Sequence, residues 1–177
     1  MDMSAPAAVR SITDRMLGAA RLDRATYEEV EADRSATGQA AFVVVGSSIA
    51  AGIGGGSGGG GDSIVLSIGA LVAWALYAWL AYVIGTKLLA GPGTKADWGE
   101  VARSLGFANA PRFFLLLGVV PALSAIVALA VGLWVLVATV VALRAALDFS
   151  TGRAIATAFL STLAQSVVAA IVLSVLA

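Results

Sequence analysis

The sequence contains no cysteine and no histidine. The missing thiols exclude disulfides, thiolate nucleophiles and lipid-modified cysteines, and the missing imidazoles remove the commonest general base and the commonest metal ligand. Charged residues are also scarce, at 12% of the chain, against about 25% in soluble domains. With a formal net charge of +0 and no basic patch, nothing indicates a nucleic-acid partner. We therefore expect a protein that is not an enzyme and that holds no cofactor and no metal.

Apolar residues dominate what is present. They make up 59% of the 177 residues, and the mean hydropathy is +0.93. A soluble core of this size cannot hide so much apolar surface, so we expect the lipid bilayer as the solvent. Five of the 11 basic and seven of the 11 acidic residues fall within residues 1–34. The sequence thus predicts a cytoplasmic helical tail at 1–36 and a membrane domain at 37–177.

The tail carries two weak helical patterns. In "SAPAAVRSITDRMLGAARL" the apolar residues Val9, Ile12, Met16 and Ala20 recur at helical spacing, which predicts an amphipathic helix that either lies on the membrane or is solvated. "DRATYEEVEAD" follows, with Asp23 placed as an N-cap. Its glutamates are interpreted as a solvated face.

Five apolar segments predict an all-α polytopic membrane protein with spans at about 37–54, 63–88, 105–121, 124–146 and 152–176. The third segment is the difficult one, because Pro111 and Arg112 interrupt it and Pro121 ends it. It is either a full crossing or a re-entrant piece. The glycine-rich "GIGGGSGGGGDS" lacks the lysine and Ser/Thr of a phosphate-binding loop and is interpreted as a flexible turn.

The distribution of lysine and arginine favours five crossings. These residues gather on the cytoplasmic side of membrane proteins. With five spans and a cytoplasmic N-terminus, all 11 basic residues fall on that side and the C-terminus lies outside. If the third segment did not cross, Arg144 and Arg153 would face outward. Arg112, slightly inside its span, would have to snorkel to the interface.

The stretch "LRAALDFSTGRAIA" places Arg144, Asp148 and Arg153 between the last two spans. We interpret it as an inner turn, in which Arg144 can pair with Asp148 if the helix continues that far, and in which Asp148 or Ser150 caps the next helix. The alternative is a buried charged relay, because charges at membrane depth are costly and usually functional.

Small and polar residues at four-residue spacing indicate helix packing. Two small-residue ridges lie on the fourth span, at Ser124, Ala128 and Gly132 and at Ala138, Ala142 and Ala146. The fifth span carries a polar stripe, Thr157, Ser161 and Gln165. This stripe is either a polar path for a solute or a set of interhelical hydrogen bonds. Beyond the tail the aspartates are Asp62, Asp97 and Asp148, none in the middle of a span, so no aspartate pair for intramembrane proteolysis is found.

Three stretches carry a family resemblance: "RLDRATYEEVEADRSATGQA" before the first span, "TKADWGEVARSLGFANAP" before the third, and "VALRAALDFSTGRA" after the fourth. Over roughly Arg21 to Ala156 the chain resembles the Yip1 domain family, especially its bacterial members. The resemblance implies five transmembrane helices with a cytoplasmic N-terminus, and its stretches add the candidate residues Asp97, Trp98, Arg103 and Pro111.

Eukaryotic members of that family act in vesicle trafficking and associate with Rab-type GTPases and with each other. This sequence lacks their longer tail and their Asp-Leu-Tyr/Trp-Gly-Pro-like segment, so GTPase binding is not carried over. We expect a non-catalytic scaffold or organiser of a bacterial inner membrane, whose partners are the lipid bilayer and either itself or other membrane proteins. The alternative is a small transporter or channel subunit with a polar path along the fifth helix. A cavity joining the polar stripe to Arg144 and Asp148 would favour the transporter, and a dry small-residue interface the scaffold.

Overall fold

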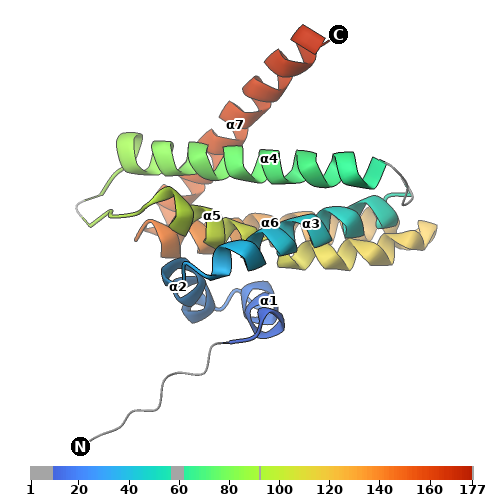
Figure 1. Ribbon diagram of the computed structural model, residues 1–177, viewed down its shortest axis with the longest axis horizontal. Coiled ribbons are helices and arrows are strands. Elements are labelled where there is room, and N and C mark those ends of the chain that lie inside the picture. The colour runs from blue at the N-terminus through green and yellow to red at the C-terminus, as the bar shows by residue number, and fades with distance from the viewer. Residues whose placement is uncertain (1–9, 57–61, 92, 177) are drawn as a thin grey trace, which may run out of the picture.

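The computed structural model describes residues 10–56, 62–91 and 93–176, and all regular structure within them is helical (Figure 1). The elements in chain order are α1 (Ile12–Ala20), α2 (Arg24–Ala32), α3 (Ala36–Gly54), α4 (Asp62–Val83), the π-helical turn η1 (Ile84–Leu88), α5 (Trp98–Phe107), the 3-10 helix η2 (Ala110–Val119), α6 (Pro121–Ala146) and α7 (Thr151–Leu176). The prediction of an all-α chain that begins with short helices is confirmed. Most of the predicted glycine-rich turn lies outside the described residues.

Four helices are long and apolar enough to cross a membrane: Ala36–Gly54, Ile64–Leu88, Pro121–Ala146 and Thr151–Val175. Their bounds lie close to those predicted for the first, second, fourth and fifth spans. At about 1.5 Å per residue, a helix of about 20 residues covers the 30 Å hydrocarbon core. The sequence therefore located these four helices by apolar length alone.

The predicted third span differs from the other four, because it is not one α-helix. The first part, α5, ends at Phe107, and Pro111 near the start of η2 explains why. Proline has no N–H, and its ring clashes with the carbonyl four residues earlier, here that of Phe107. A side-chain amide satisfies one carbonyl at the end of α5, because Asn109 Nδ2 donates to the Leu105 carbonyl at 2.9 Å. The chain then continues as a 3-10 helix, whose rise of about 2.0 Å per residue lets ten residues cover about 20 Å.

The segment formed by α5 and η2 runs beside α3 over the whole length of that helix. Glycines mark the contact, because a Cβ added to them would collide with the opposing chain. A Cβ at Gly106 would lie 2.6 Å from Ala40 Cβ, and one at Gly46 would lie 2.8 Å from the ring of Phe113. At the other end, a Cβ at Gly54 would lie 1.8 Å from the Leu115 carbonyl oxygen. The segment thus joins the end of the bundle near Ala40 to the end near Gly54.

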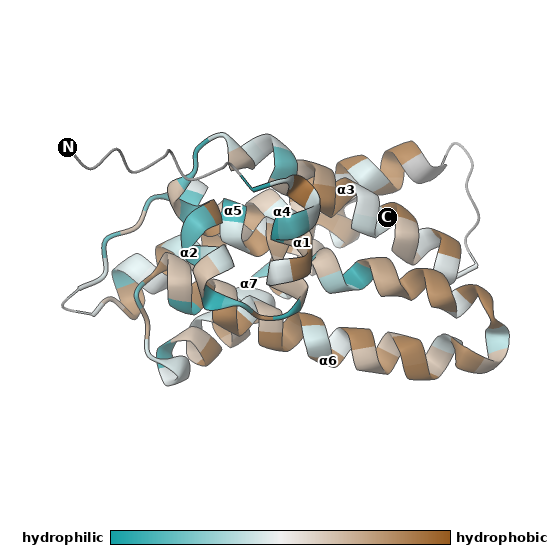
Figure 2. Ribbon diagram, turned by 90° about the horizontal axis from the view of Figure 1, so that it is seen from below, coloured by the Kyte–Doolittle hydropathy of each residue, from teal (hydrophilic) through white to brown (hydrophobic). Residues whose placement is uncertain are grey.

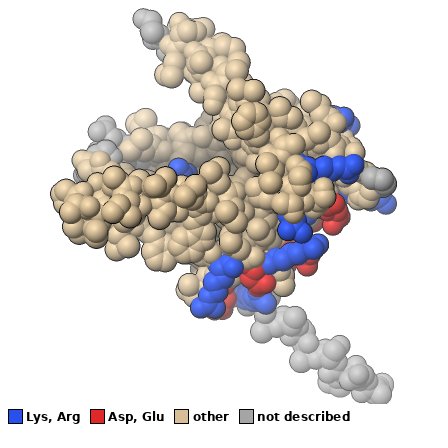
Figure 3. Space-filling model, turned by 180° about the vertical axis from the view of Figure 1, so that it is seen from behind, with Lys and Arg blue, Asp and Glu red and all other residues tan. Residues whose placement is uncertain are grey.

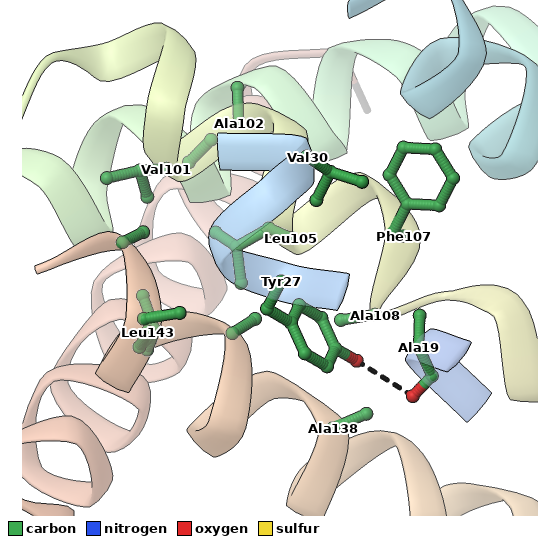
Figure 4. Close-up of a cluster of buried hydrophobic side chains, with 14 of the residues drawn as sticks. Ala19, Tyr27, Val30, Val101, Ala102, Leu105, Phe107, Ala108, Ala138 and Leu143 are labelled. Carbon is green, nitrogen blue, oxygen red and sulfur yellow. Dashed lines mark hydrogen bonds between the residues drawn. The ribbon is translucent and has the colours of Figure 1, made fainter. Parts of the chain in front are cut away.

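The two ends of the bundle differ in polarity. Hydrophilic residues lie around α1 and α2, whereas hydrophobic residues follow the length of α3 and α6 (Figure 2). The fully buried core gathers at the polar end, where Tyr27, Val101, Phe107 and Leu143 interlock (Figure 4). The charged side chains cover that same end and the adjoining flank (Figure 3).

The two small-residue ridges predicted on α6 have different outcomes. Ala138, Ala142 and Ala146 are all buried, so this ridge packs as predicted. Gly132 is exposed, and nothing lies within 4 Å of a Cβ added to it. The packing role predicted for Gly132 is therefore wrong for the contacts within this chain.

Helix α7 leaves the bundle obliquely (Figure 1). Its first half packs on α4, where the Tyr77 hydroxyl donates to the Ala158 carbonyl at 3.2 Å and Gln165 Nε2 donates to the Ala73 carbonyl at 2.8 Å. Most residues after Gln165 are exposed in this chain. Their surroundings are therefore expected to be lipid.

We predict that Gly54→Leu lowers stability and that Gly132→Leu does not. At Gly54 the added side chain collides with the backbone of η2, and overpacking of this kind costs about 1–3 kcal/mol. At Gly132 the side chain enters open space and the helix propensity improves. Thermal unfolding of the two purified variants in the same detergent is the measurement. Equal melting temperatures for the two variants would contradict the close contact between α3 and η2.

Candidate functional site

The polar tail is not a free segment but is docked on one end of the bundle. Tyr27 and Val30 of α2 are completely buried, and α2 packs on α5 and α6. The Tyr27 hydroxyl donates to the Ala19 carbonyl at 3.1 Å (Figure 4). The end of α1 is held by Trp134 of α6, whose Nε1 donates to the Ala20 carbonyl at 2.7 Å. The first tail helix therefore packs on protein, which neither sequence alternative anticipated.

Arg103 holds α2 to the bundle. This side chain on α5 is 4% exposed, and its Nε donates to the carbonyls of Val30 and Glu31, each at 3.0 Å. Its Nη2 also donates to the Glu31 carbonyl. These carbonyls close the last turn of α2, where backbone acceptors lack helical partners and the helix dipole is negative. Arg103 was a candidate from sequence, and the structure places it as the cap between tail and bundle.

A second arginine ties the tail together internally. Arg15 of α1 is 1% exposed, and its Nη2 contacts Glu29 at 2.8 Å and Asp33 at 2.6 Å, while Nη1 donates to Gln39 at 2.9 Å. Burial alone would lower the pKa of Arg15, but hydrogen bonds and the charges of Glu29 and Asp33 raise it. Sequence reasoning missed this cluster because it assigned the glutamates to a solvated face. That interpretation is wrong for Glu29.

The candidate residues around α5 have local structural roles. Asp97 is the N-cap of a capping box: its carboxylate accepts from the Glu100 amide at 2.9 Å, and the Glu100 carboxylate accepts from the Asp97 amide at 2.8 Å. Trp98 opens the helix and is 41% exposed. Pro111 is buried at the start of η2. These residues fix where α5 begins and where η2 takes over.

The stretch from Arg144 to Arg153 forms the turn between α6 and α7. Helix α6 ends at Ala146, and Asp148 adopts a left-handed conformation with φ of 52°. The helix therefore stops before Arg144 and Asp148 can meet at i,i+4, and the described residues contain no ion pair between them. Arg153 instead lies over Gly91, where an added Cβ would come within 2.0 Å of the guanidinium.

Glu31 is the most strongly perturbed acid at this polar end. Burial, and after it the negative charges of Glu100, Asp148 and Glu28, raise its pKa to about 7 against the opposing effect of Arg103. Acids from α2, α5 and the α6–α7 turn therefore face one another. This arrangement makes the docking of the tail sensitive to pH near neutrality.

The predicted polar stripe of α7 begins with two buried hydroxyl groups and ends at a cavity. Thr157 and Ser161 are completely buried, and their hydroxyls have no hydrogen-bond partner among the described residues. Gln165 reaches a cavity of about 210 Å³ that it shares with Asn109, Arg112, Trp74, Tyr77 and Thr139. Arg144 and Asp148 are not in its lining. The stripe thus meets a polar cavity, but a different one from that expected.

Comparison with known proteins gives one positive result. The family model of the Yip1 domain matches residues 22–173, which covers all helices from α2 to most of α7 and confirms the resemblance found in the sequence. No curated protein and no solved structure matches the chain.

We predict that stability falls as pH rises from about 4.5 to about 7 and that Glu31→Gln flattens this dependence. The raised pKa means that the folded chain retains a proton that an unfolded chain releases in this window, so raising the pH favours unfolding. Above pH 7 the variant should therefore be more stable than the wild type.

Melting temperatures at pH 5 and pH 8 test this. The matched control is Glu28→Gln. Glu28 lies about one helical turn from Glu31, is exposed and pairs with Arg24. This variant should keep most of the fall in melting temperature between pH 5 and pH 8. An unchanged slope in Glu31→Gln would refute the assignment.

Proposed function

The chain belongs to the Yip1 domain family, and from this premise we propose that it is a non-catalytic organiser of a bacterial inner membrane. It works through helix packing and through contacts made at its cytoplasmic face. Its membrane location follows from the family and from the four apolar helices. The organiser role is carried by one observation, the docked tail.

The docked tail presents a fixed polar surface. Helix α2 buries Tyr27 and Val30 while it exposes Arg24 and Glu28. A surface that is already ordered binds a partner without the entropy cost of ordering a free tail. Because both signs of charge lie on this surface (Figure 3), it suits a protein partner of mixed charge better than a uniformly anionic one.

The second candidate function, a small transporter, is supported by the cavity. It lies within the bundle, and Gln165 and Arg112 bring polar groups to it. Substrate sites of transporters lie near the middle of the bilayer in comparable surroundings. The organiser role is preferred because the cavity that the polar stripe reaches is not lined by Arg144 or Asp148.

We further propose five crossings with the N-terminus cytoplasmic and the C-terminus outside. The contacts from Gly106–Ala40 to Gly54–Leu115 support this, because α5 and η2 accompany α3 from end to end. If α3 crosses the bilayer, the adjoining segment crosses with it. The gathering of charge at one end (Figure 3) supports the orientation.

The organiser role is tested with Arg103→Gln. Losing the cap leaves buried carbonyls unsatisfied, at about 1–3 kcal/mol, and releases the tail. We expect proteins that co-purify with the wild type from native membranes, identified by mass spectrometry, to be lost in this variant although its bundle still melts cooperatively. Lys87→Gln, at an exposed residue of η1, should retain them. No enrichment over a tag-only control, or the same proteins on Arg103→Gln, would contradict the proposal.

The topology is tested by labelling single cysteines, which the natural chain lacks. An impermeant thiol reagent should label Val120→Cys, 51% exposed between η2 and α6, in intact cells. It should reach Ser150→Cys and Lys95→Cys only after the cells are opened. A re-entrant third segment would reverse the results for Val120→Cys and Ser150→Cys and leave Lys95→Cys unchanged.

A further inference from the structure

We propose that the cavity between α4, η2, α6 and α7 binds an oxyanion, a phosphate or a carboxylate, on the guanidinium of Arg112. The cavity holds about 210 Å³, enough for an oxyanion with accompanying water. This site is separate from the docked tail, so the inference goes beyond the organiser role and does not rest on it.

Arg112 lies at the middle depth of the bundle. The next residue, Phe113, packs against Gly46, near the centre of α3. Across the cavity, Ala73 lies eleven residues after Asp62 at the start of α4, about 16 Å along the helix. A charged side chain at this depth is expensive, and such residues pair with a counter-charge or line a water-filled space that serves a function.

The chain supplies no counter-charge for Arg112 in its described part. Among the described residues no carboxylate lies within 4.0 Å of its guanidinium, and the side-chain hydrogen bond that it makes runs from Nη1 to Asn109 Oδ1 at 3.2 Å. The described acids lie in the tail, around α5 and in the α6–α7 turn, and Asp62 is three turns of α4 away from Ala73. A bound oxyanion would supply the counter-charge that the described residues do not.

Three other donors around the cavity hold helices together. Trp74 Nε1 donates to the Ala102 carbonyl at 2.9 Å, and Tyr77 and Gln165 donate to backbone carbonyls as described above. These bonds leave the guanidinium, together with the hydroxyl of Thr139, to face the cavity, and the guanidinium is the charged donor group of its lining. Its planar fork matches the paired oxygens of a carboxylate or a phosphate.

The cavity is accessible from outside. Arg112 is exposed although it lines the cavity. Helix α7 diverges from the bundle toward its C-terminal end (Figure 1). An oxyanion can therefore arrive dissolved in water or as the headgroup phosphate of a lipid.

Anion-dependent stabilisation tests the site. The protein is purified in an uncharged maltoside detergent, and its melting temperature is followed during titration with inorganic phosphate, with acetate or with phosphatidylglycerol, at constant ionic strength set by sodium chloride. We expect at least one of these to raise the melting temperature of the wild type. Arg112→Gln should weaken the apparent affinity by about tenfold or more, since it removes a charge-assisted hydrogen bond, and Lys87→Gln should not.

The outcomes separate the sources of the anion. A response to phosphate or acetate identifies a dissolved anion, and a response to phosphatidylglycerol alone identifies a lipid headgroup. Without anion, Arg112→Gln should melt no lower than the wild type, because an unpaired charge is removed. If that variant does not fold, Arg112→Lys, which keeps the charge and loses the fork, should show a weakened response. No response of the wild type, or an undiminished response in the Arg112 variants, overturns the proposal.

Discussion

The bundle depends on a constraint that one residue imposes: the α-helix that begins at Trp98 cannot continue through Pro111. The chain therefore changes to a narrower helix with a longer rise per residue. That narrow helix fits between α3 and α6, where it lies against the glycines of α3 at backbone distance. The same change of helix type sets the direction of Arg112, directly after the proline, and so creates the polar cavity in an otherwise apolar domain.

At the polar end, hydrogen bonds and ion pairs of two buried arginines add to the packing of the apolar core. Arg103 satisfies the carbonyls at the end of α2, and Arg15 joins acids from α2 and its C-cap. Both guanidiniums are buried with their partners in place, and removing one partner of such a set is costly. The tail and the bundle consequently form one body, and the acids gathered around Glu31 make the interface respond to protonation.

Apolar length was sufficient to locate α3, α4, α6 and α7 from the sequence, because a helix that crosses lipid must satisfy its backbone internally over a fixed thickness. The turn between α6 and α7 and the family were also predictable from local patterns. What failed were contacts between distant residues. Arg15 meets acids 14 and 18 residues away, and no local spacing reveals this. Gly132 belonged to a valid small-residue pattern, but the pattern does not say which face of α6 meets a neighbour. The cavity around Arg112 is lined by residues from six helical elements, so the sequence predicted only an arginine near an interface.

The number of residues between Pro111 and Pro121 fixes the length of the narrow helix and the rotation of the residues that follow. One residue added between these prolines would lengthen it by about 2.0 Å and turn everything beyond the insertion by about 120°. Gly118 would then lose its close approach to Gly54, where an added Cβ already lies 2.8 Å from the Gly54 carbonyl. The spacing between the prolines should thus tolerate almost no change in number, whereas the lipid-facing side chains along it remain free to vary in kind.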